Sequence, residues 1–115
     1  MLHSHEEHVL NGLMNAVANR QQLLANNLTN VNTPGYVRQD MDFTSVLKDL
    51  KNEHSNKSYD EIIDQSTFRD SETKATYESE LAEMSKNHLQ FMLMTRINGH
   101  IYQHLEEATQ SGRAA

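Results

Sequence analysis

The sequence predicts a mainly α-helical chain, in which a long N-terminal helix and a long C-terminal helix pair as a coiled-coil-like hairpin with an extended or irregular middle segment. Two observations carry this prediction. Apolar residues recur at three- and four-residue spacing near both ends of the chain, which is the period of one face of an α-helix. Glycine and proline, which interrupt helices, number only 4 and 1 among 115 residues. This length fits one domain overall.

The N-terminal helix is expected from about Ser4 to Leu28, within a segment 1–32 that ends in asparagines. Gly12 weakens this helix by about 1 kcal/mol relative to alanine. The polar Gln21 interrupts the apolar stripe, which then resumes. The residues of the stripe are Leu10, Leu13, Met14, Val17, Leu24 and Leu28.

Segment 33–43 is expected to be a turn followed by an extended arm. Asparagines in 26–32 should end the helix, because their side chains compete for backbone hydrogen bonds and tolerate left-handed backbone angles. Thr33-Pro34-Gly35-Tyr36 has the sequence of a type II turn, in which proline fixes φ at the second position and glycine supplies a positive φ at the third. Apolar and polar residues then alternate as far as Phe43, as in a short strand.

The middle segment, residues 44–76, is expected to be irregular. Residues 44–50 can form two helical turns, since Val46, Leu47 and Leu50 share one side. Residues 51–76 carry few apolar anchors. We interpret them as loop, or as small β structure that needs a partner to settle.

Helical periodicity returns over residues 77–110, and a frayed tail is expected at 111–115. The helix carries a heptad-like seam and a second apolar stripe, and between Leu89 and Met94 it is apolar almost all round. Such a helix is normally buried on more than one side, and one other long helix cannot cover it. The chain is therefore expected to work inside an assembly. The N-terminal stripe should pack, within or between subunits, on Leu81, Met84, His88, Leu89, Phe91, Met92 and Tyr102.

Composition argues against several classes of function. The net charge of −6 is spread evenly along the chain, whereas nucleic-acid binding and docking to anionic lipid need a clustered basic face. Cysteine is absent, so thiolate chemistry and disulfides are excluded. The longest apolar run, Phe91–Met94, is too short to span a bilayer, and residues 1–8 do not have the pattern of a cleavable signal peptide.

Histidines are the candidate metal ligands. A helical pair at i and i+4, such as His100 and His104, can hold zinc, and an N-terminal group lies beside two glutamates. The His-Glu-x-x-His motif is not matched at either place. We favour the interpretation that these histidines are exposed, and we keep a metal-binding helical protein as an alternative. The residues of that alternative are His3, His5, His8, His100 and His104.

Carboxylates are the only other candidates for catalysis. Asp40 and Asp42 flank Met41, and glutamates at the start of the last helix are explained by the favourable interaction of acids with the helix macrodipole. Motifs of a nucleophile elbow, a phosphate-binding loop or a dinucleotide site do not occur. We therefore expect no enzymatic activity, no catalytic residue and no cofactor. A cytoplasmic coiled-coil adaptor is a further alternative.

Residues 24–43 carry a resemblance to a known family. They contain Ala-Asn-Asn-x-x-Asn-x-x-Thr-Pro-Gly-Tyr after an amphipathic helix, which resembles the N-terminal signature of the bacterial flagellar axial proteins of the rod and hook. The following Arg-Gln-Asp-x-Asp-Phe is most similar to the proximal (B-type) rod proteins of the basal body. Residues 80–91 are similar to that family's closing helix, although His88 stands where glutamine is usual. The matched turn residues are Asn26, Asn27, Asn30, Asn32, Thr33, Pro34, Gly35, Tyr36, Arg38 and Phe43.

The resemblance implies a structural protein that polymerises through its terminal helices into part of the torque-transmitting drive shaft. The implied partners are other copies of the chain, other rod proteins, the membrane-ring and rod-adaptor proteins at the base, and the flagellar export apparatus. It implies a location in the basal body, after export from the cytoplasm without a cleavable signal peptide. Another flagellar axial component, either another rod protein or a hook-associated protein, is the alternative within the family.

Overall fold

A computed structural model describes the backbone of residues 2–114 and the side chains of residues 4–100, 103, 104, 106 and 107. Helices dominate, as the sequence predicts, and the two longest lie at the ends of the chain. The elements in order are α1 (Leu2–Thr29), β1 (Arg38–Met41), α2 (Phe43–Lys51), α3 (Tyr59–Ser66), β2 (Thr67–Asp70) and α4 (Tyr77–Ala114).

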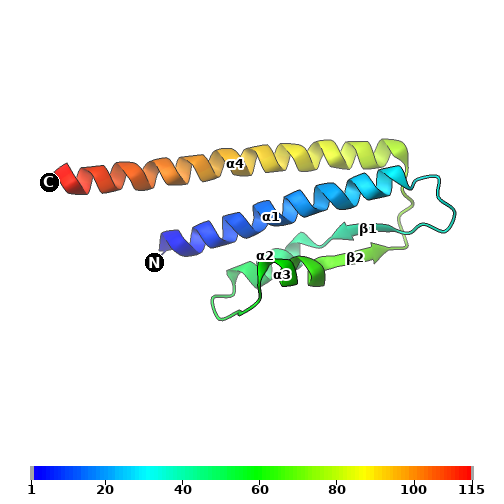
Figure 1. Cartoon of the computed structure of the whole chain (residues 1–115), viewed down its shortest axis with the longest axis horizontal. Coiled ribbons are helices and arrows are strands. Elements are labelled where there is room, and N and C mark those ends of the chain that lie inside the picture. The colour runs from blue at the N-terminus through cyan, green and yellow to red at the C-terminus, as the bar shows by residue number, and fades with distance from the viewer. Residues whose placement is uncertain (1, 115) are drawn as a thin grey trace.

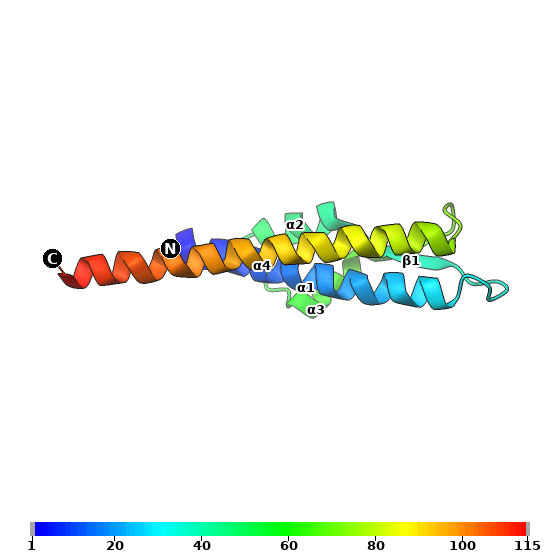
Figure 2. The same ribbon diagram turned by 90° about the horizontal axis from the view of Figure 1, so that it is seen from above.

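The molecule is elongated, measuring 66 × 29 × 16 Å, and its long axis is set by the two terminal helices. Helices α1 and α4 lie side by side and run in opposite directions (Figures 1 and 2). The short middle elements pack against the other side of α1, so α1 lies between them and α4 (Figure 1). The predicted pairing of long terminal helices is confirmed. Helix α4 continues beyond its expected end at 110.

The middle region is more regular than the sequence suggested. Strands β1 and β2 pair antiparallel, with Arg38 opposite Asp70 and Met41 opposite Thr67. Of the two alternatives for residues 51–76, loop or small β structure, strand β2 is an instance of the second, and it pairs with the predicted arm. Helix α3 is not anticipated by the sequence, because eight residues are too few to show a clear helical period. Ser58 caps it by accepting a hydrogen bond from the N–H of Glu61 at 3.2 Å.

The main hydrophobic core lies between α1 and the middle elements rather than between the two long helices. It is a single buried cluster with contributions from α1, β1, α2 and α3, to which Phe43 and Tyr59 add partly buried rings. Because α1 supplies residues to this cluster and also to the α4 interface, it is apolar on more than one side. The buried members are Ala16, Met41, Val46, Leu50, Ile62 and Ile63.

Gly12 of α1 lies against the side chain of Leu50 of α2. A Cβ added to this glycine would lie 2.8 Å from Cδ1 of Leu50 and 3.1 Å from its Cγ, inside van der Waals contact. Leu50 is itself fully buried, so its side chain has no open space into which to move. The glycine that weakens the isolated helix therefore permits the close packing of α1 on α2.

The predicted type II turn follows α1. Gly35 has a φ of 77°, and the N–H of Tyr36 donates to the carbonyl oxygen of Thr33 at 3.2 Å. Among the described residues, Gly35 is the only one with a positive φ. The turn directs the chain back along α1, so that β1 runs beside the helix (Figure 1).

Candidate functional site

Asn27, near the end of α1, attaches the arm to the helix. Its side chain is fully buried. Its Nδ2 donates to the carbonyl oxygen of Gln39 at 2.8 Å, and its Oδ1 accepts from the N–H of Gln39 at 2.9 Å. The hydroxyl of Tyr36 donates to the same Oδ1 at 2.8 Å. One asparagine side chain thus determines where the strand lies against α1.

The other asparagines of this segment stabilise the turn itself. Nδ2 of Asn30 donates to the carbonyl oxygen of Asn26 at 2.8 Å, and the hydroxyl of Thr33 donates to Oδ1 of Asn30 at 3.1 Å. Residues 32–35 are exposed at the tip of the molecule. The resemblance residues therefore divide into those that hold the arm and those on an exposed tip.

Arg38, on β1, lies at the centre of a buried ion-pair cluster. Its side chain is only 6% exposed. Its Nε donates to Oε1 of Glu80 at 2.8 Å, its Nη1 donates to Oδ2 of Asp70 at 2.8 Å, and its Nη2 donates to Oδ2 of Asp40 at 3.3 Å. A single guanidinium therefore connects β1, β2 and α4.

Arg20 extends the same cluster onto α1. Its Nε donates to Oδ1 of Asp40 at 2.7 Å, and its Nη2 donates to Oε2 of Glu83 at 3.0 Å. Phe43 lies beneath the guanidinium, with 5.9 Å between Cζ and the ring centroid. With Arg20 included, the cluster joins α1, β1, β2 and α4 at the end of the molecule where α4 begins.

The contacts of the cluster favour the charged forms of Arg38, Asp40 and Glu83. The hydrogen bond to Glu80 raises the pKa of Arg38 against the opposing effect of burial. Burial would raise the pKa of Asp40, but the hydrogen bond from Arg20, with the N–H of Met41, outweighs it and the pKa is lowered. The hydrogen bond from Arg20 likewise lowers the pKa of Glu83. Carboxylates held in this way are suited to fastening elements together rather than to moving protons.

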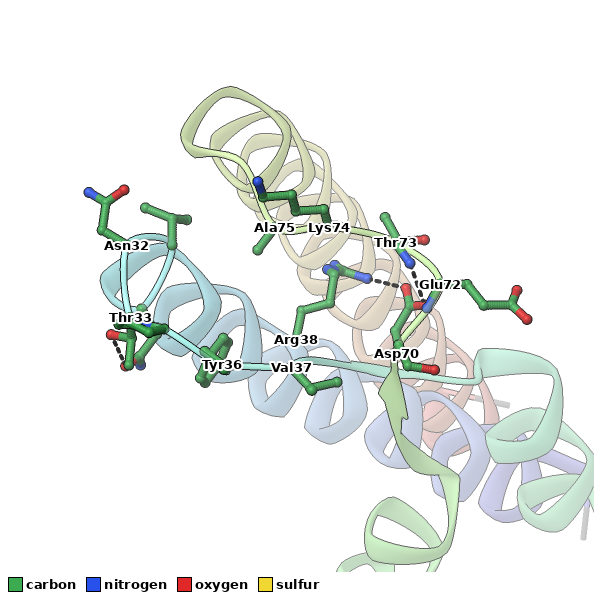
Figure 3. A pocket seen from close by; sticks show the side chains of 15 residues that line it. Asn32, Thr33, Tyr36, Val37, Arg38, Asp70, Glu72, Thr73, Lys74 and Ala75 are labelled. Carbon is green, nitrogen blue, oxygen red and sulfur yellow. Dashed lines mark hydrogen bonds and ion pairs between the residues drawn. The ribbon is translucent and has the colours of Figure 1, made fainter.

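A groove of about 430 Å³ lies between the Asn-rich turn and the loop that follows β2. Figure 3 shows Tyr36, Arg38 and Asp70 along it, with Lys74 and Thr73 contributed by the loop. Asp70 accepts from the N–H of Thr73 at 3.1 Å as well as from Arg38, so these lining residues are already hydrogen-bonded to one another. The groove is polar and open, and the same cluster that joins the elements forms part of its wall.

The contact of α4 with α1 is partly polar. Asn87 is buried, and its Nδ2 donates to the carbonyl oxygen of Val17 at 2.8 Å and to Oε1 of Gln21 at 2.8 Å. Glu80 and Asn87 occupy the α1-facing positions, while their neighbours Leu81 and His88, expected in the seam, are exposed. The buried positions are therefore displaced by one residue at two places, where Glu80 pairs with Arg38 of the arm and Nδ2 of Asn87 pairs with two acceptors on α1.

The remaining predicted packing residues separate into three groups. Val17 and Leu24 are buried, whereas Leu89 and Met92 are exposed by 59% and 51%. The side chain of Tyr102 lies outside the described residues. The partly buried members are Leu10, Leu13, Met14, Leu28, Met84 and Phe91.

Four exposed apolar residues of α4 lie on the face that points away from α1, whereas the exposed Ile97 lines a hollow with Leu10 and Leu13 of α1. We call these four residues the outer stripe; they are Leu81, Leu89, Met92 and Leu93, which are exposed by 38% to 59%. The middle elements lie on the far side of α1 and leave the stripe uncovered (Figure 1). Contiguous apolar surface of this kind marks interaction sites.

The histidines that the structure describes are not gathered into a metal site. The rings of His100 and His104 are 6.4 Å apart, and those of His5 and His8 are 6.3 Å apart. The hydroxyl of Tyr59 donates to the carbonyl oxygen of His8 at 2.9 Å, which ties α3 to α1. Within the described part of the chain, no three histidine or carboxylate side chains are placed to hold one metal ion. The side chain of His3 lies outside the described residues.

Sequence reasoning did not single out Arg20, Asp70, Glu80 or Asn87 as site residues. For Glu80 and Asn87 a signal exists, because a spacing of seven places them on one helix face. For Arg20 and Asp70 no local signal exists, since their partners lie far away in the sequence.

The fold and the site define a mainly helical protein with a buried ion-pair cluster at one end and the outer stripe on the exposed face of α4. No family model matches the chain, and a search of curated proteins returns no significant relative. In the described part of the chain, every helix is too short or too polar to traverse a bilayer.

Proposed function

We propose that this chain is a structural subunit of the proximal rod of the bacterial flagellar basal body. It polymerises through its terminal helices with copies of itself and with other rod proteins. At the base of the rod, the chain contacts the membrane-ring and rod-adaptor proteins. It reaches this place through the flagellar export apparatus and contributes to the shaft that transmits torque.

The outer stripe is the observation that carries this proposal. A lone chain leaves Leu89 and Leu93 each 59% exposed on a helix that α1 covers from one side only. Burying apolar surface contributes about 25 cal/mol per Å², so neighbouring subunits that cover the stripe stabilise the assembly. Long helices with an uncovered apolar face suit a subunit whose stable state is the polymer.

The turn supports the proposal because it contains residues of the motif that resembles the flagellar axial proteins. Asn27, Gly35 and Tyr36 are motif residues, and each has a defined role in placing the arm. A motif whose residues set the angle between a helix and an arm fits a subunit that must present both to neighbours in a fixed geometry.

Two alternatives remain distinct from this proposal. Another axial component of the flagellum would share the helices and the turn, and partner identity in purified basal bodies separates it from a proximal rod protein. A histidine-rich metal-binding protein would need ligands that the described histidines do not bring together. Titration calorimetry with zinc tests that alternative directly.

The test uses the bacterium that encodes the chain. Deleting the gene should abolish motility and leave basal bodies without a complete rod in electron cryotomograms, and the intact gene should restore both. Leu89→Glu should fail to restore motility, because it puts a charge on the outer stripe. Gln65→Glu, at an exposed position of α3, is the matched control and should restore it. Normal motility after deletion would overturn the proposal.

A further inference from the structure

A central row of residues runs along the outer face of α4, through the outer stripe. Its members are all exposed and follow alternating steps of four and three residues, which is the spacing of a coiled-coil seam. The spacing keeps the row on one face over about five helical turns. The row consists of Glu78, Ala82, Ser85, Leu89, Met92 and Arg96.

The two halves of this row are complementary to each other. The first half carries an acid and two small residues, Ala82 and Ser85. The second half carries two large apolar residues, Leu89 and Met92, and ends in a base. Small side chains are therefore at one end of the row and large ones at the other, with opposite charges at the two extremes.

We propose that this row binds the same row of a second copy of the chain, with the two α4 helices antiparallel. A two-fold axis near position 87 then places Glu78 opposite Arg96 of the second copy. It also places Ala82 opposite Met92 and Ser85 opposite Leu89, so each large side chain meets a small one. Every pair occurs twice, as an isologous interface requires.

The parallel arrangement lacks this complementarity. It sets Glu78 against Glu78 and Arg96 against Arg96, which repel. It also sets Leu89 against Leu89 while leaving Ala82 against Ala82, so one end of the seam is crowded and the other has voids. Like charges and unequal packing thus both select the antiparallel pair.

The rest of the molecule leaves space for such a partner. The middle elements lie beyond α1, so a second copy approaching the row meets α4 alone (Figure 1). Leu81 and Leu93 flank the row on opposite sides and extend the apolar area. Lys86 lies on one flank near the axis, where its charge is balanced by Glu83 of its own helix at 3.4 Å.

This inference does not rest on the proposed function. The antiparallel pair is closed and covers the outer stripe when no other neighbour is present. Any assembly that uses the stripe must first separate the pair. Self-association of the purified chain and motility of cells are measured separately, so either result can fail without the other.

Charge reversal tests the pairing. Sedimentation equilibrium of the whole chain should show a monomer–dimer equilibrium. Glu78→Lys and Arg96→Glu should each raise the dimer dissociation constant at least about tenfold, since each turns two attractive pairs into repulsive ones. The double variant should restore association, as should an equimolar mixture of the two single variants. Glu72→Lys and Arg69→Glu, exposed positions outside α4, change the net charge equally and should leave association unchanged.

Cross-linking fixes the direction of the helices, because the natural chain has no cysteine. Under mild oxidation, a mixture of Ala82→Cys and Met92→Cys should form the mixed disulfide. Each variant alone should not, because identical positions lie about 15 Å apart along the helix in the antiparallel pair. A chain that stays monomeric at millimolar concentration would overturn the inference. So would a disulfide formed by Ala82→Cys alone, or single charge reversals that leave association unaltered while circular dichroism shows a folded chain.

Discussion

The side-chain amide of Asn27 pairs with the peptide group of Gln39 as a neighbouring β-strand would, through hydrogen bonds of 2.8 and 2.9 Å. Asn27 belongs to α1 and Gln39 to β1, so the pair joins two elements that differ in backbone geometry. A helix cannot offer its own peptide groups to a strand, because they are used within the helix. The asparagine side chain supplies a donor and an acceptor in their place.

Replacing Asn27 by alanine should lower the free energy of unfolding by about 1–3 kcal/mol, because the peptide group of Gln39 and the hydroxyl of Tyr36 both lose their partner in a partly buried place. Chemical denaturation followed by circular dichroism measures this loss. Asn26→Ala is the matched control, since Asn26 is the exposed neighbour and contributes only its carbonyl oxygen. Equal losses in the two variants would contradict the role assigned to Asn27.

Replacing Arg38 by methionine should lower the free energy of unfolding by about 3 kcal/mol or more. The substitution keeps an apolar stem but leaves the buried carboxylate of Glu80 without its cation, and an unpaired buried charge is strongly destabilising. Urea denaturation is the measurement. Arg69→Met, at an exposed position of β2, should change stability by no more than about 0.5 kcal/mol.

Two glycines in helices should respond oppositely to alanine. Gly99 has open space where the Cβ of an alanine would lie, so Gly99→Ala should stabilise the chain by up to about 1 kcal/mol through helix propensity. Gly12→Ala should destabilise it, because overpacking against Leu50 costs about 1–3 kcal/mol and outweighs the same gain. Thermal unfolding of both variants compares them, and a stabilised Gly12→Ala would show that α2 is not packed closely on α1.

Replacing Gly35 by valine should cost at least about 1 kcal/mol per subunit, because a β-branched residue is strained at a φ of 77°. No atom lies within 4 Å of a Cβ at this position, so the cost is one of backbone conformation alone. Gly35→Asn should cost less, since asparagine tolerates the left-handed region. Urea denaturation measures the difference, and the unfolding midpoint of the valine variant should be lower than that of the asparagine variant. Under the proposed function, the valine variant should also block rod assembly.

The stability of the chain should fall in acid. The folded-state pKa values of Asp40 and Glu83 are lowered, so the unfolded chain takes up protons more readily than the folded one. Their contribution is complete above the ordinary carboxyl values near about 4, and it is lost as the pH falls through the lower folded values. Urea midpoints measured from pH 7 to pH 2 should therefore drop below about pH 4. Asp40→Asn should weaken this dependence, whereas Asp64→Asn, on the exposed side of α3, should leave it intact.

Much of the architecture could be predicted from local pattern. The stripe through Val17 and Leu24 predicted α1, and Pro34-Gly35 predicted the turn, because helical period and turn chemistry are properties of neighbouring residues. The apolar run at Leu89–Met94 predicted a face that one helix cannot cover, and the structure leaves Leu89, Met92 and Leu93 exposed. Helix α3 was not predicted, because its two adjacent isoleucines, Ile62 and Ile63, do not show the three- or four-residue spacing of a helix.

The site was less predictable than the fold. Its place in the sequence explains Glu80 as an acid that favours a helix start, yet in the structure Glu80 is also the buried partner of Arg38. Leu81 and His88 were expected in the seam, where Glu80 and Asn87 are found instead. Where an apolar residue such as Leu81 stands next to a polar one such as Glu80, a sequence pattern favours the apolar residue as the buried one. Within the single chain that choice misses the buried residue, because the polar group meets a partner from a distant part of the chain; packing of Leu81 and His88 between subunits stays a prediction.

Local sequence pattern accounts for the two long helices, the turn between the first helix and the arm, and the excess of apolar surface on the last helix. Each depends on residues within a few positions of one another. The face of α4 that meets α1, and the gathering of Arg20, Arg38 and their carboxylates at one end, depend on contacts that form when the chain folds. Those contacts join residues far apart in the sequence, and their energy depends on burial and distance, which exist only once the chain has folded.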